Sequence, residues 1–372
     1  MNPTDNLRSL HTAVQKGLKS LVSGDELAIA KALTLRELKM LELRGLLNVL
    51  PPLHDLHTRL SQSQPFVSAG WSAQSSSVIL RALGMTETEP WRWGLMPERA
   101  WLGAKTNEAF DFSLVFPASA ETNSLPLVRK ACAEAGWAEA LTSPFVQETN
   151  RIWSLGTGRH SEHPEGPVMT LALVFSQEWE RLCQLRAADP TRVVDLSDPA
   201  LLRHLRECSE ETNPWMTQDL RLALDVLQVR DLEGLVLAMA FASHPDELQR
   251  FRTPNESSLS CGDSNIERLL QPTRGYLVYQ EQFLELCQRL GGWDLVRADR
   301  MRRNLGKRAE IGAVEMMTLA QDAVARGWDS RVVKNLTDQM NMMLSLIGIL
   351  KAHVLPMALQ ALEVAARTNP GG

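Results

Sequence analysis

The sequence predicts an α+β protein that is mainly helical. Near both ends of the chain, apolar residues recur every three or four positions, which is the period of an amphipathic helix. One apolar run in the middle, Val168 to Phe175, has the length and composition of a strand. Of the 372 residues 44% are hydrophobic and 22% charged, as in an ordinary soluble protein. A chain of this length can form two or three domains.

The first 50 residues are predicted to be helical. One apolar stripe is formed by Leu7, Leu10, Val14, Leu18 and Leu21. Thr34 and Glu37 have the spacing of a capping box, which predicts that a leucine-rich helix begins there and ends at Pro51-Pro52. His54 and His57 follow on a helical turn. Since a metal site would need further ligands nearby, we interpret both as ordinary surface histidines.

Val67 to Thr86 places a loop of small residues ahead of an apolar helix. Such a loop lets the backbone approach a phosphate at a helix N-terminus, although small residues also mark plain tight packing. Farther along, Leu125 to Trp137 is predicted to be a helix, and the strand at Val168 to Phe175 contains no acidic residue. From Ser197 to the end the pattern is helical.

The most informative stretch runs from Pro272 to Arg308. A turn at Pro272 to Gly275 precedes an amphipathic helix that Gly291-Gly292 ends. The next helix is basic, with only Asp299 as an acid among its cations: Arg297, Arg300, Arg302, Arg303, Lys307 and Arg308. Arginine and lysine at this density offer a surface for phosphate, and the alternative is a solvated helix face.

Charge and cysteine content restrict the classes of protein. The net charge of −5 and a pI near 6.0 mean that any contact with nucleic acid is local. The five cysteines are far apart and lack zinc-binding spacing, which is typical of reduced thiols and predicts a cytoplasmic protein. No signal peptide and no apolar run near 18 residues is present, so neither secretion nor a membrane partner is expected.

The wording of the informative stretch resembles a known family. P-T-x-G-x-x-V-Y-Q-E-Q, followed by G-G-x-x-x-x-A-D-x-x-R-R-x-x-G-K, is similar to the fingers of the alpha subunit of bacterial DNA polymerase III, a C-family polymerase. Leu350 to His353 repeats that family's L-K-A-H. With gaps, the resemblance runs from Val67 to Pro356. It implies a degenerate nucleotidyltransferase-type palm (67–196) and a helical fingers-like domain (197–372), with the basic helix facing nucleotide or DNA. The residues before it (1–66) are expected to form an N-terminal helical segment, from their apolar periodicity.

The same resemblance shows where the polymerase chemistry is missing. The family holds two Mg²⁺ on three carboxylates. With a one-residue insertion Asp111 takes the first acid position, whereas Ser113 and Val115 replace the other acids of that motif; without the insertion both catalytic positions become phenylalanine. Ala172 or a neighbour stands where the third catalytic Asp would be. The Gly-Ser pair that holds the triphosphate is Ser72-Ala73 here, and the family's arginine is Trp71.

These observations favour a catalytically inactive accessory factor of bacterial DNA replication or repair that keeps its basic helix. Its expected partners are DNA, bound weakly, and other replication or repair proteins. Asp111 is the sole retained acid candidate, so no cofactor is expected. One alternative is an active polymerase with non-standard carboxylates, Glu108 beside Asp111, which would need Mg²⁺. The other is a protein-docking module that never touches DNA.

Overall fold

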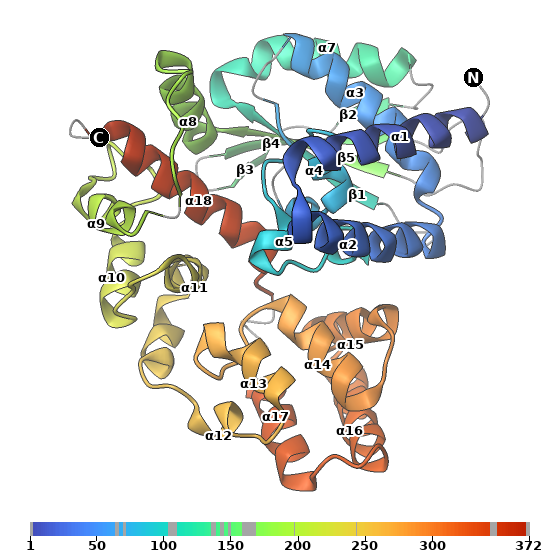
Figure 1. The fold of residues 1–372 in the computed structure, drawn as a ribbon, viewed down its shortest axis with the longest axis vertical. Helices are drawn as coiled ribbons and strands as arrows, with labels where there is room; N and C mark the ends of the chain where they lie inside the picture. Colours follow the sequence, from blue (N-terminus) through green and yellow to red (C-terminus); the bar gives the residue numbers. More distant parts are fainter. Residues whose placement is uncertain are drawn as a thin grey trace. The chain divides into compact units, whose positions relative to one another are not determined.

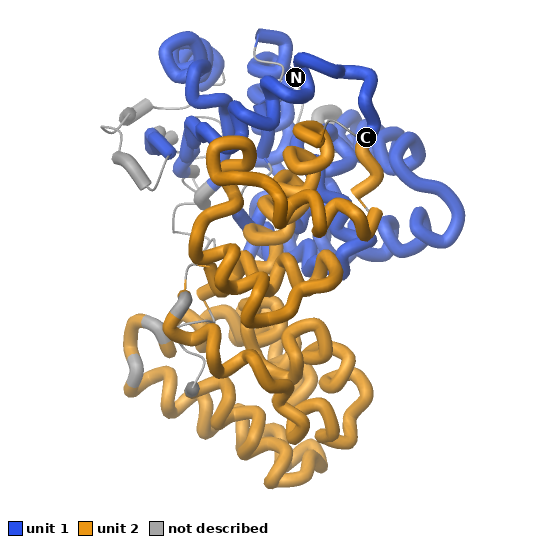
Figure 2. Tube along the Cα trace, turned by 90° about the vertical axis from the view of Figure 1, so that its left-hand side faces the viewer, with its two compact units in different colours: residues 1–193 blue, residues 194–372 orange. Residues whose placement is uncertain are grey.

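The chain forms two compact units, residues 1–193 and 194–372, which Figure 2 colours separately. The computed structural model describes residues 3–63, 67–69, 72–102, 110–134, 139–141, 145–147, 150–157, 169–196, 198–242, 244–342 and 348–369. A mixed sheet lies in the first unit, and helices make up the described part of the second (Figure 1). The predicted mainly helical α+β class is therefore confirmed. The expected segments 1–66 and 67–196 fall mostly within the first unit.

Helices form most of the first unit before its sheet. They are α1 (Pro3–Leu21), α2 (Gly24–Leu43), η1 (Leu47–Val49), α3 (Leu50–Ser63), η2 (Ser72–Ser76), α4 (Val78–Ala82), α5 (Pro90–Trp93) and α6 (Arg99–Leu102). The capping box predicted at Thr34 and Glu37 is wrong, because α2 runs uninterrupted through both positions. Thr34 instead donates its hydroxyl to the carbonyl of Ala30, one turn back.

His57 also departs from the sequence interpretation. Its ring is buried on α3, with Nε2 lying 3.3 Å from the carbonyl oxygen of Val67. Burial lowers the pKa of His57 to about 4, because the charged imidazolium would lose its hydration. His57 is thus a core residue that attaches α3 to the segment entering the sheet, and the surface assignment was wrong for it.

The sheet contains β1 (Phe110–Pro117), β2 (Glu139–Leu141), β3 (Phe145–Gln147), β4 (Asn150–Thr157) and β5 (Met169–Ser176). Its order is β1-β5-β4-β2, with β3 also paired to β4. β1 and β5 are parallel, whereas β4 runs antiparallel to β5. The strand predicted at Val168 to Phe175 is confirmed as β5. Helices η3 (Ala118–Ala120), α7 (Glu121–Glu134) and α8 (Gln177–Ala188) complete the unit, and α7 confirms the helix expected there.

Side chains alternate across the two central strands. Phe112 and Phe116 of β1 and Leu171 and Phe175 of β5 are fully buried, and the rings of Phe116 and Phe175 stack 5.2 Å apart. Because successive residues of a strand point to opposite faces, this buried set lies on one face of the sheet. The intervening positions, which include Ser113 and Ala172, therefore share the other face.

The described elements of the second unit are all helical. They are α9 (Ala200–Glu207), α10 (Gln218–Val226), α11 (Leu232–Ala242), η4 (Pro245–Phe251), α12 (Glu256–Leu259), α13 (Ser264–Leu270), η5 (Gln271–Thr273), α14 (Gln280–Gly291), α15 (Leu295–Lys307), α16 (Ala309–Ala325), α17 (Ser330–Met342) and α18 (Lys351–Thr368). α18 returns to pack against α9 and α11, which joins the end of the chain to the start of this unit.

Residues of the stretch from Pro272 to Arg308 connect several parts of this helical unit. Buried Gln282 accepts hydrogen bonds from the amides of Val278 and Tyr279 and donates to the carbonyl of Leu269 and the hydroxyl of Thr273. Gln280 donates from its amide to Gly348, and its backbone to Ile349. These polar side chains satisfy backbone groups inside the fold, so they act as structural residues.

Glu281 connects the two stretches that resemble the polymerase family. Its carboxylate accepts hydrogen bonds from the amides of Lys351 and Ala352, each at 3.1 Å. Those amides open α18, and a carboxylate there satisfies unpaired N–H groups and complements the helix dipole. The Y-Q-E-Q and L-K-A-H stretches, about 70 residues apart in sequence, are thus one structural contact.

Candidate functional site

The strand register pairs two of the positions that the resemblance aligns with polymerase acids. Ser113 of β1 pairs with Ala172 of β5, which in turn pairs with Ser154 of β4. Paired residues on neighbouring strands point to the same face, so these three form one row across the sheet. We call Ser113, Ala172 and Ser154 the small-residue row. All three are half-buried. The row thus joins Ser113, one of the acid positions expected on β1, to Ala172, which stands at or next to the expected third acid. Val115, the other expected acid position, is buried and pairs with Val174.

The next row contains Asp111, which pairs with Thr170, and Thr170 pairs with Gly156. The backbone of Asp111 lies in β1, whereas its side chain and the whole of Glu108 lie outside the described residues. Within the described part, these two rows offer hydroxyl and methyl groups. A hard divalent cation prefers charged oxygen ligands, which such side chains do not provide.

Clusters of metal-binding side chains are also absent from the wider described part of the chain. In the parts of the chain that the structure describes, no group of three or more His, Cys, Asp or Glu side chains could hold a metal ion. Two-metal phosphoryl transfer requires a dense set of carboxylates to fix both ions. The described surface of the sheet therefore lacks the ligands for this chemistry.

The loop that resembles the triphosphate-binding segment lies beside β1. Ser68 and Val115 exchange two backbone hydrogen bonds, at 2.8 and 3.1 Å, which place this segment against the strand. Ser72, at the position of the family's glycine, has a φ of +74°, a conformation that favours glycine. Trp71 lies outside the described residues. The path of the loop therefore passes close to the small-residue row.

A carboxylate of the chain itself occupies the end of this loop. Glu37 Oε2 accepts from the amides of Val78 and Ile79, at 2.9 and 3.1 Å, where α4 begins. Its Oε1 accepts from the indole of Trp101, at 2.7 Å, and from the hydroxyl of Ser77. The two amides are the groups that a phosphate at this helix N-terminus would use. They are already bonded to an internal anion.

Glu37 is fully buried, and burial raises its pKa from the ordinary value of 4.5 to about 7. The four donors favour the ionised carboxylate, but the loss of hydration outweighs them. When Glu37 is protonated, its carboxyl O–H can donate a hydrogen bond to the Ser77 hydroxyl, so both states keep a hydrogen bond there. Sequence reasoning missed this role, because Glu37 contacts residues 40 to 64 positions away.

The basic helix α15 uses part of its charge inside the fold. Asp299 is fully buried, and it forms ion pairs with Arg302, at 2.9 Å, and Arg303, at 3.2 Å. Both arginines are mostly buried as well. A buried carboxylate without partners is strongly destabilising, so these two guanidinium groups neutralise Asp299.

Two further arginines of α15 have acidic neighbours. The guanidinium of Arg297 lies 3.6 Å from the ring centroid of Trp293, and it is 3.6 Å from the carboxylate of Asp322. Arg300 is exposed and lies 3.3 Å from Glu315. Exposed ion pairs of this kind contribute little to stability and can exchange partners. Arg300 is therefore accessible to an incoming phosphate at small cost.

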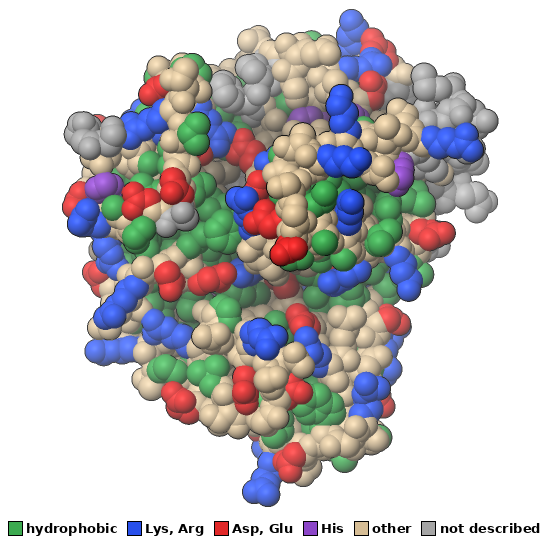
Figure 3. Space-filling view, in the orientation of Figure 1, with side chains coloured by type: hydrophobic (Ala, Val, Ile, Leu, Met, Phe, Trp, Pro, Cys, Tyr) green, Lys and Arg blue, Asp and Glu red, His purple; other side chains and the backbone are tan. Residues whose placement is uncertain are grey.

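Lys307 and Arg308 differ from the other four cations. Both are exposed at the C-terminal end of α15, and no ion pair joins either to an acid among the residues that the structure describes. Of the six predicted phosphate contacts, these two and Arg300 remain the most accessible. Figure 3 shows positive and negative side chains interspersed on the face it presents, so any phosphate site is local.

Comparison with known proteins supports the resemblance to the alpha subunit of bacterial DNA polymerase III. Residues 217–326 match the sequence model of the bacterial DNA polymerase III alpha subunit finger domain. DNA polymerase III subunit alpha of Borreliella burgdorferi is 31% identical over 102 residues, which is 27% of this chain and 9% of the relative. The Pasteurella multocida subunit is 25% identical over 156 residues, covering 41% and 13%. That of Helicobacter pylori is 39% identical over 74 residues, covering 20% and 6%.

The alignments thus span at most 13% of the length of these relatives. The matched segment contains α10 to α16, which include the whole of α15. As for membranes, none of the helices in the described part of the chain is long and apolar enough to span one.

We predict that Glu37→Ala destabilises the protein. Four donors would be left without their acceptor in the core, and we expect a loss of about 3 kcal/mol or more in the free energy of unfolding. Urea unfolding followed by tryptophan fluorescence measures it. Glu42→Ala, at an exposed position of the same helix, is the matched control and should change stability by less than about 0.5 kcal/mol.

The penalty should depend on pH. Between pH 4.5 and about 7 the folded protein binds more protons at Glu37 than the unfolded chain, so this group's contribution to stability falls as pH rises across that window. Glu37→Ala should therefore cost more at pH 5 than at pH 8. If Glu37→Ala and the control Glu42→Ala have the same free energy of unfolding at pH 5, Glu37 does not hold α4.

Proposed function

The matched finger segment makes this chain a relative of the alpha subunit of bacterial DNA polymerase III, and we propose that it is an inactive accessory factor of DNA replication or repair. One observation supports the proposal: the β1–β5 register pairs Ser113 with Ala172, two of the positions that the resemblance aligns with the family's carboxylates, and Val115, another such position, pairs with Val174. We infer that the chain has kept the strands that carry these positions and has replaced their carboxylates.

A second, independent feature supports the loss of activity. Nucleotide addition requires a triphosphate anchored close to the metal ions. In this chain the amides of Val78 and Ile79 are bonded to Glu37, at the end of the loop that resembles the triphosphate-binding segment. A triphosphate binding there would have to displace a buried carboxylate and would then face its negative charge. Both the metal ligands and the anion site are therefore unfavourable.

The proposal keeps a weak contact with nucleic acid. Lys307, Arg308 and Arg300 supply positive charge at or near the accessible end of α15, in the segment that matches the finger domain. Arg302 and Arg303 contribute indirectly, since they neutralise buried Asp299 and so preserve the helix. Phosphate contacts of this kind give affinity without reading sequence. We expect binding to depend on the DNA backbone alone.

The active-polymerase alternative would have to use Asp111 and Glu108. Two ions about 3.5–4 Å apart share bridging ligands, and two carboxylates are too few to surround both. The docking-module alternative has more support, because four of the six cations on α15 already have acidic partners. Both our proposal and the docking-module alternative expect an inactive protein, and they differ in whether the protein binds DNA.

For catalysis, we predict that the purified protein adds no deoxynucleotide to a primer–template with Mg²⁺ or Mn²⁺. Ser113→Asp should also stay inactive, because Ala172 and Glu37 are unchanged. The measurement is primer extension on a denaturing gel, with Asp111→Ala as the contamination control. Extension by the parent that disappears in Asp111→Ala would overturn the proposal and favour the active polymerase.

For DNA binding, we predict that Lys307→Ala/Arg308→Ala weakens binding of a labelled single strand in a fluorescence anisotropy titration. Each phosphate contact adds about 0.7 to the slope of log K against log salt, so two lost contacts should lower it by about 1.4. Arg302 and Arg303 are left intact, because their removal would unpair Asp299 and confuse binding with unfolding.

The control for this titration is Arg331→Ala/Lys334→Ala. It removes the same charge from exposed positions of α17 in the same unit. This variant should bind as the parent does, apart from a small general effect of net charge. If both double variants behave alike, or if the parent binds no DNA even at low salt, the docking-module alternative replaces the DNA-binding part of the proposal.

A further inference from the structure

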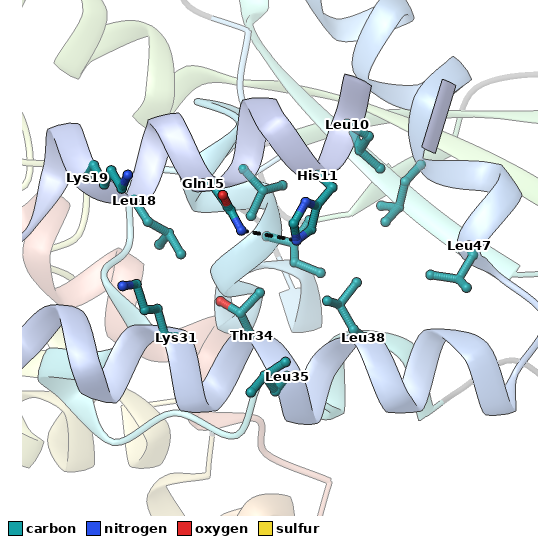
Figure 4. Close-up of a pocket in the computed structure, with 13 residues that line it drawn as sticks. Leu10, His11, Gln15, Leu18, Lys19, Lys31, Thr34, Leu35, Leu38 and Leu47 are labelled. Atoms are coloured by element: carbon teal, nitrogen blue, oxygen red, sulfur yellow. Dashed lines mark hydrogen bonds between the residues drawn. The ribbon is translucent and has the colours of Figure 1, made fainter. Parts of the chain in front are cut away.

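An apolar groove lies between α1 and α2 in the first unit. It has a volume of about 480 Å³ and is lined by Leu10, His11, Val14, Gln15, Leu18, Lys19, Lys31, Thr34, Leu35, Leu38, Leu47, Leu50 and Ile79. Figure 4 shows Leu10 and Leu18 reaching down from α1 and Thr34 and Leu38 reaching up from α2 into the space between them. We call this the α1–α2 groove.

The two helices that form the groove are each attached to α4. α1 approaches α4 so closely that a Cβ on Gly17 would lie 1.8 Å from the carbonyl oxygen of Ala82. α2 is attached to α4 through Glu37, which accepts hydrogen bonds from the first two amides of α4. Ile79 of α4 lines the groove between them. Because both walls are fixed to the same element, the groove is preformed.

The side chains along the groove are apolar inside and positive at its edge. Lys19 and Lys31 are exposed and lie at the same end in Figure 4, and they are the lysines of the lining. No acidic side chain is among the described lining residues. The space-filling view shows hydrophobic side chains gathered between α1 and α2, with Lys and Arg beside them (Figure 3).

Leu35 exposes apolar surface to water at the open side of the groove, which is energetically unfavourable. Its side chain is 69% exposed on α2 and lines the groove. From Leu10 to Leu18 the wall extends about 12 Å, two helical turns, since an α-helix rises 1.5 Å per residue. An apolar slot of this kind between two helices accepts the apolar face of a third helix, which anchors at positions i, i+3 or i+4, and i+7.

We propose that the α1–α2 groove binds an amphipathic helix of a partner protein whose flanks are acidic. Its apolar residues would cover Leu35 and Leu38, and its acids would face Lys19 and Lys31. A fatty acid is the less suitable occupant, because exposed His11, Gln15 and Leu35 leave one long side of the groove open to water. The inference goes beyond the proposed function and does not depend on α15 or on DNA.

The probe for the test is a fluorescein-labelled helical peptide of about 16 residues, with leucines at i, i+4 and i+7 and glutamates on both flanks. A second probe carries lysine in place of every glutamate. We expect the full-length protein to bind the glutamate probe at least about tenfold more tightly in fluorescence anisotropy. Equal affinity for the two probes, or none for either, overturns the proposal.

Two leucines on α2 supply a matched pair of variants. Leu35→Glu changes the groove, whereas Leu43→Glu changes another exposed leucine, 63% accessible, that does not line it. Leu35→Glu should weaken the glutamate probe at least about tenfold, and Leu43→Glu should leave it within about twofold. Similar effects of the two changes would show that the peptide binds elsewhere, and the proposal would fail.

Charge reversal gives a second measurement that does not touch the apolar wall. Lys19→Glu/Lys31→Glu should bind the lysine probe in preference to the glutamate probe. Lys307→Ala/Arg308→Ala should bind the glutamate probe as the parent does, so failure here is distinguishable from failure of DNA binding. If dodecanoate quantitatively displaces ANS from the groove while both peptides leave ANS bound, the occupant is an acyl chain and the helix proposal is wrong.

Discussion

A carboxylate can be buried in a protein only where donors or cations surround it, and this constraint determines what the chain can still bind. Glu37, Glu281 and Asp299 are three such groups. Glu37 accepts hydrogen bonds from the first amides of α4, and Glu281 accepts them from the first amides of α18. Asp299 forms ion pairs with Arg302 and Arg303. Helix amides and arginines are the usual ligands of phosphate. In this chain the three buried acids bind these helix amides and arginines, and the same hydrogen bonds and ion pairs stabilise the fold.

The constraint also separates fold from chemistry. The motif around Gln282 and Glu281 satisfies backbone groups and therefore survives in a chain whether or not it performs catalysis. Ser113 and Ala172 take part in the β1–β5 pairing through backbone atoms, which many side chains permit. A lineage that loses nucleotide addition can replace the acids of the row while keeping the motif. Under the proposed function, this difference accounts for a resemblance that is kept in the fingers and absent at Ser113 and Ala172.

Local patterns in the sequence predicted much of this structure. The α+β class, β5, α7 and the basic helix all follow from apolar periodicity, strand composition and helix-ending glycines. The Ser113–Ala172 pair was accessible only because a resemblance assigned both positions to one site. What the sequence did not reveal depends on contacts between distant residues. The spacing of Thr34 and Glu37 imitates a capping box, yet Glu37 caps α4 instead, and His57 is buried by the segment at Val67.

The cations of α15 illustrate the same limit. Their number was evident, but a sequence does not show that Asp299 is buried between two of them, so all six were expected to face phosphate. In the structure they separate into two that neutralise Asp299, two beside Asp322 or Glu315, and the exposed pair Lys307 and Arg308. Burial, and not residue type, decides which of them a ligand can reach.

The central proposal, that β1 and β5 no longer hold a two-metal centre, is tested most directly by Mn²⁺ binding followed by electron paramagnetic resonance. Free Mn²⁺ gives a six-line signal that weakens when the ion is bound. With the protein in molar excess, with and without dATP, the account predicts that added protein leaves the signal at the intensity of the protein-free control. A loss of signal equivalent to one or two ions per chain, reversed by Asp111→Asn, would contradict the claim.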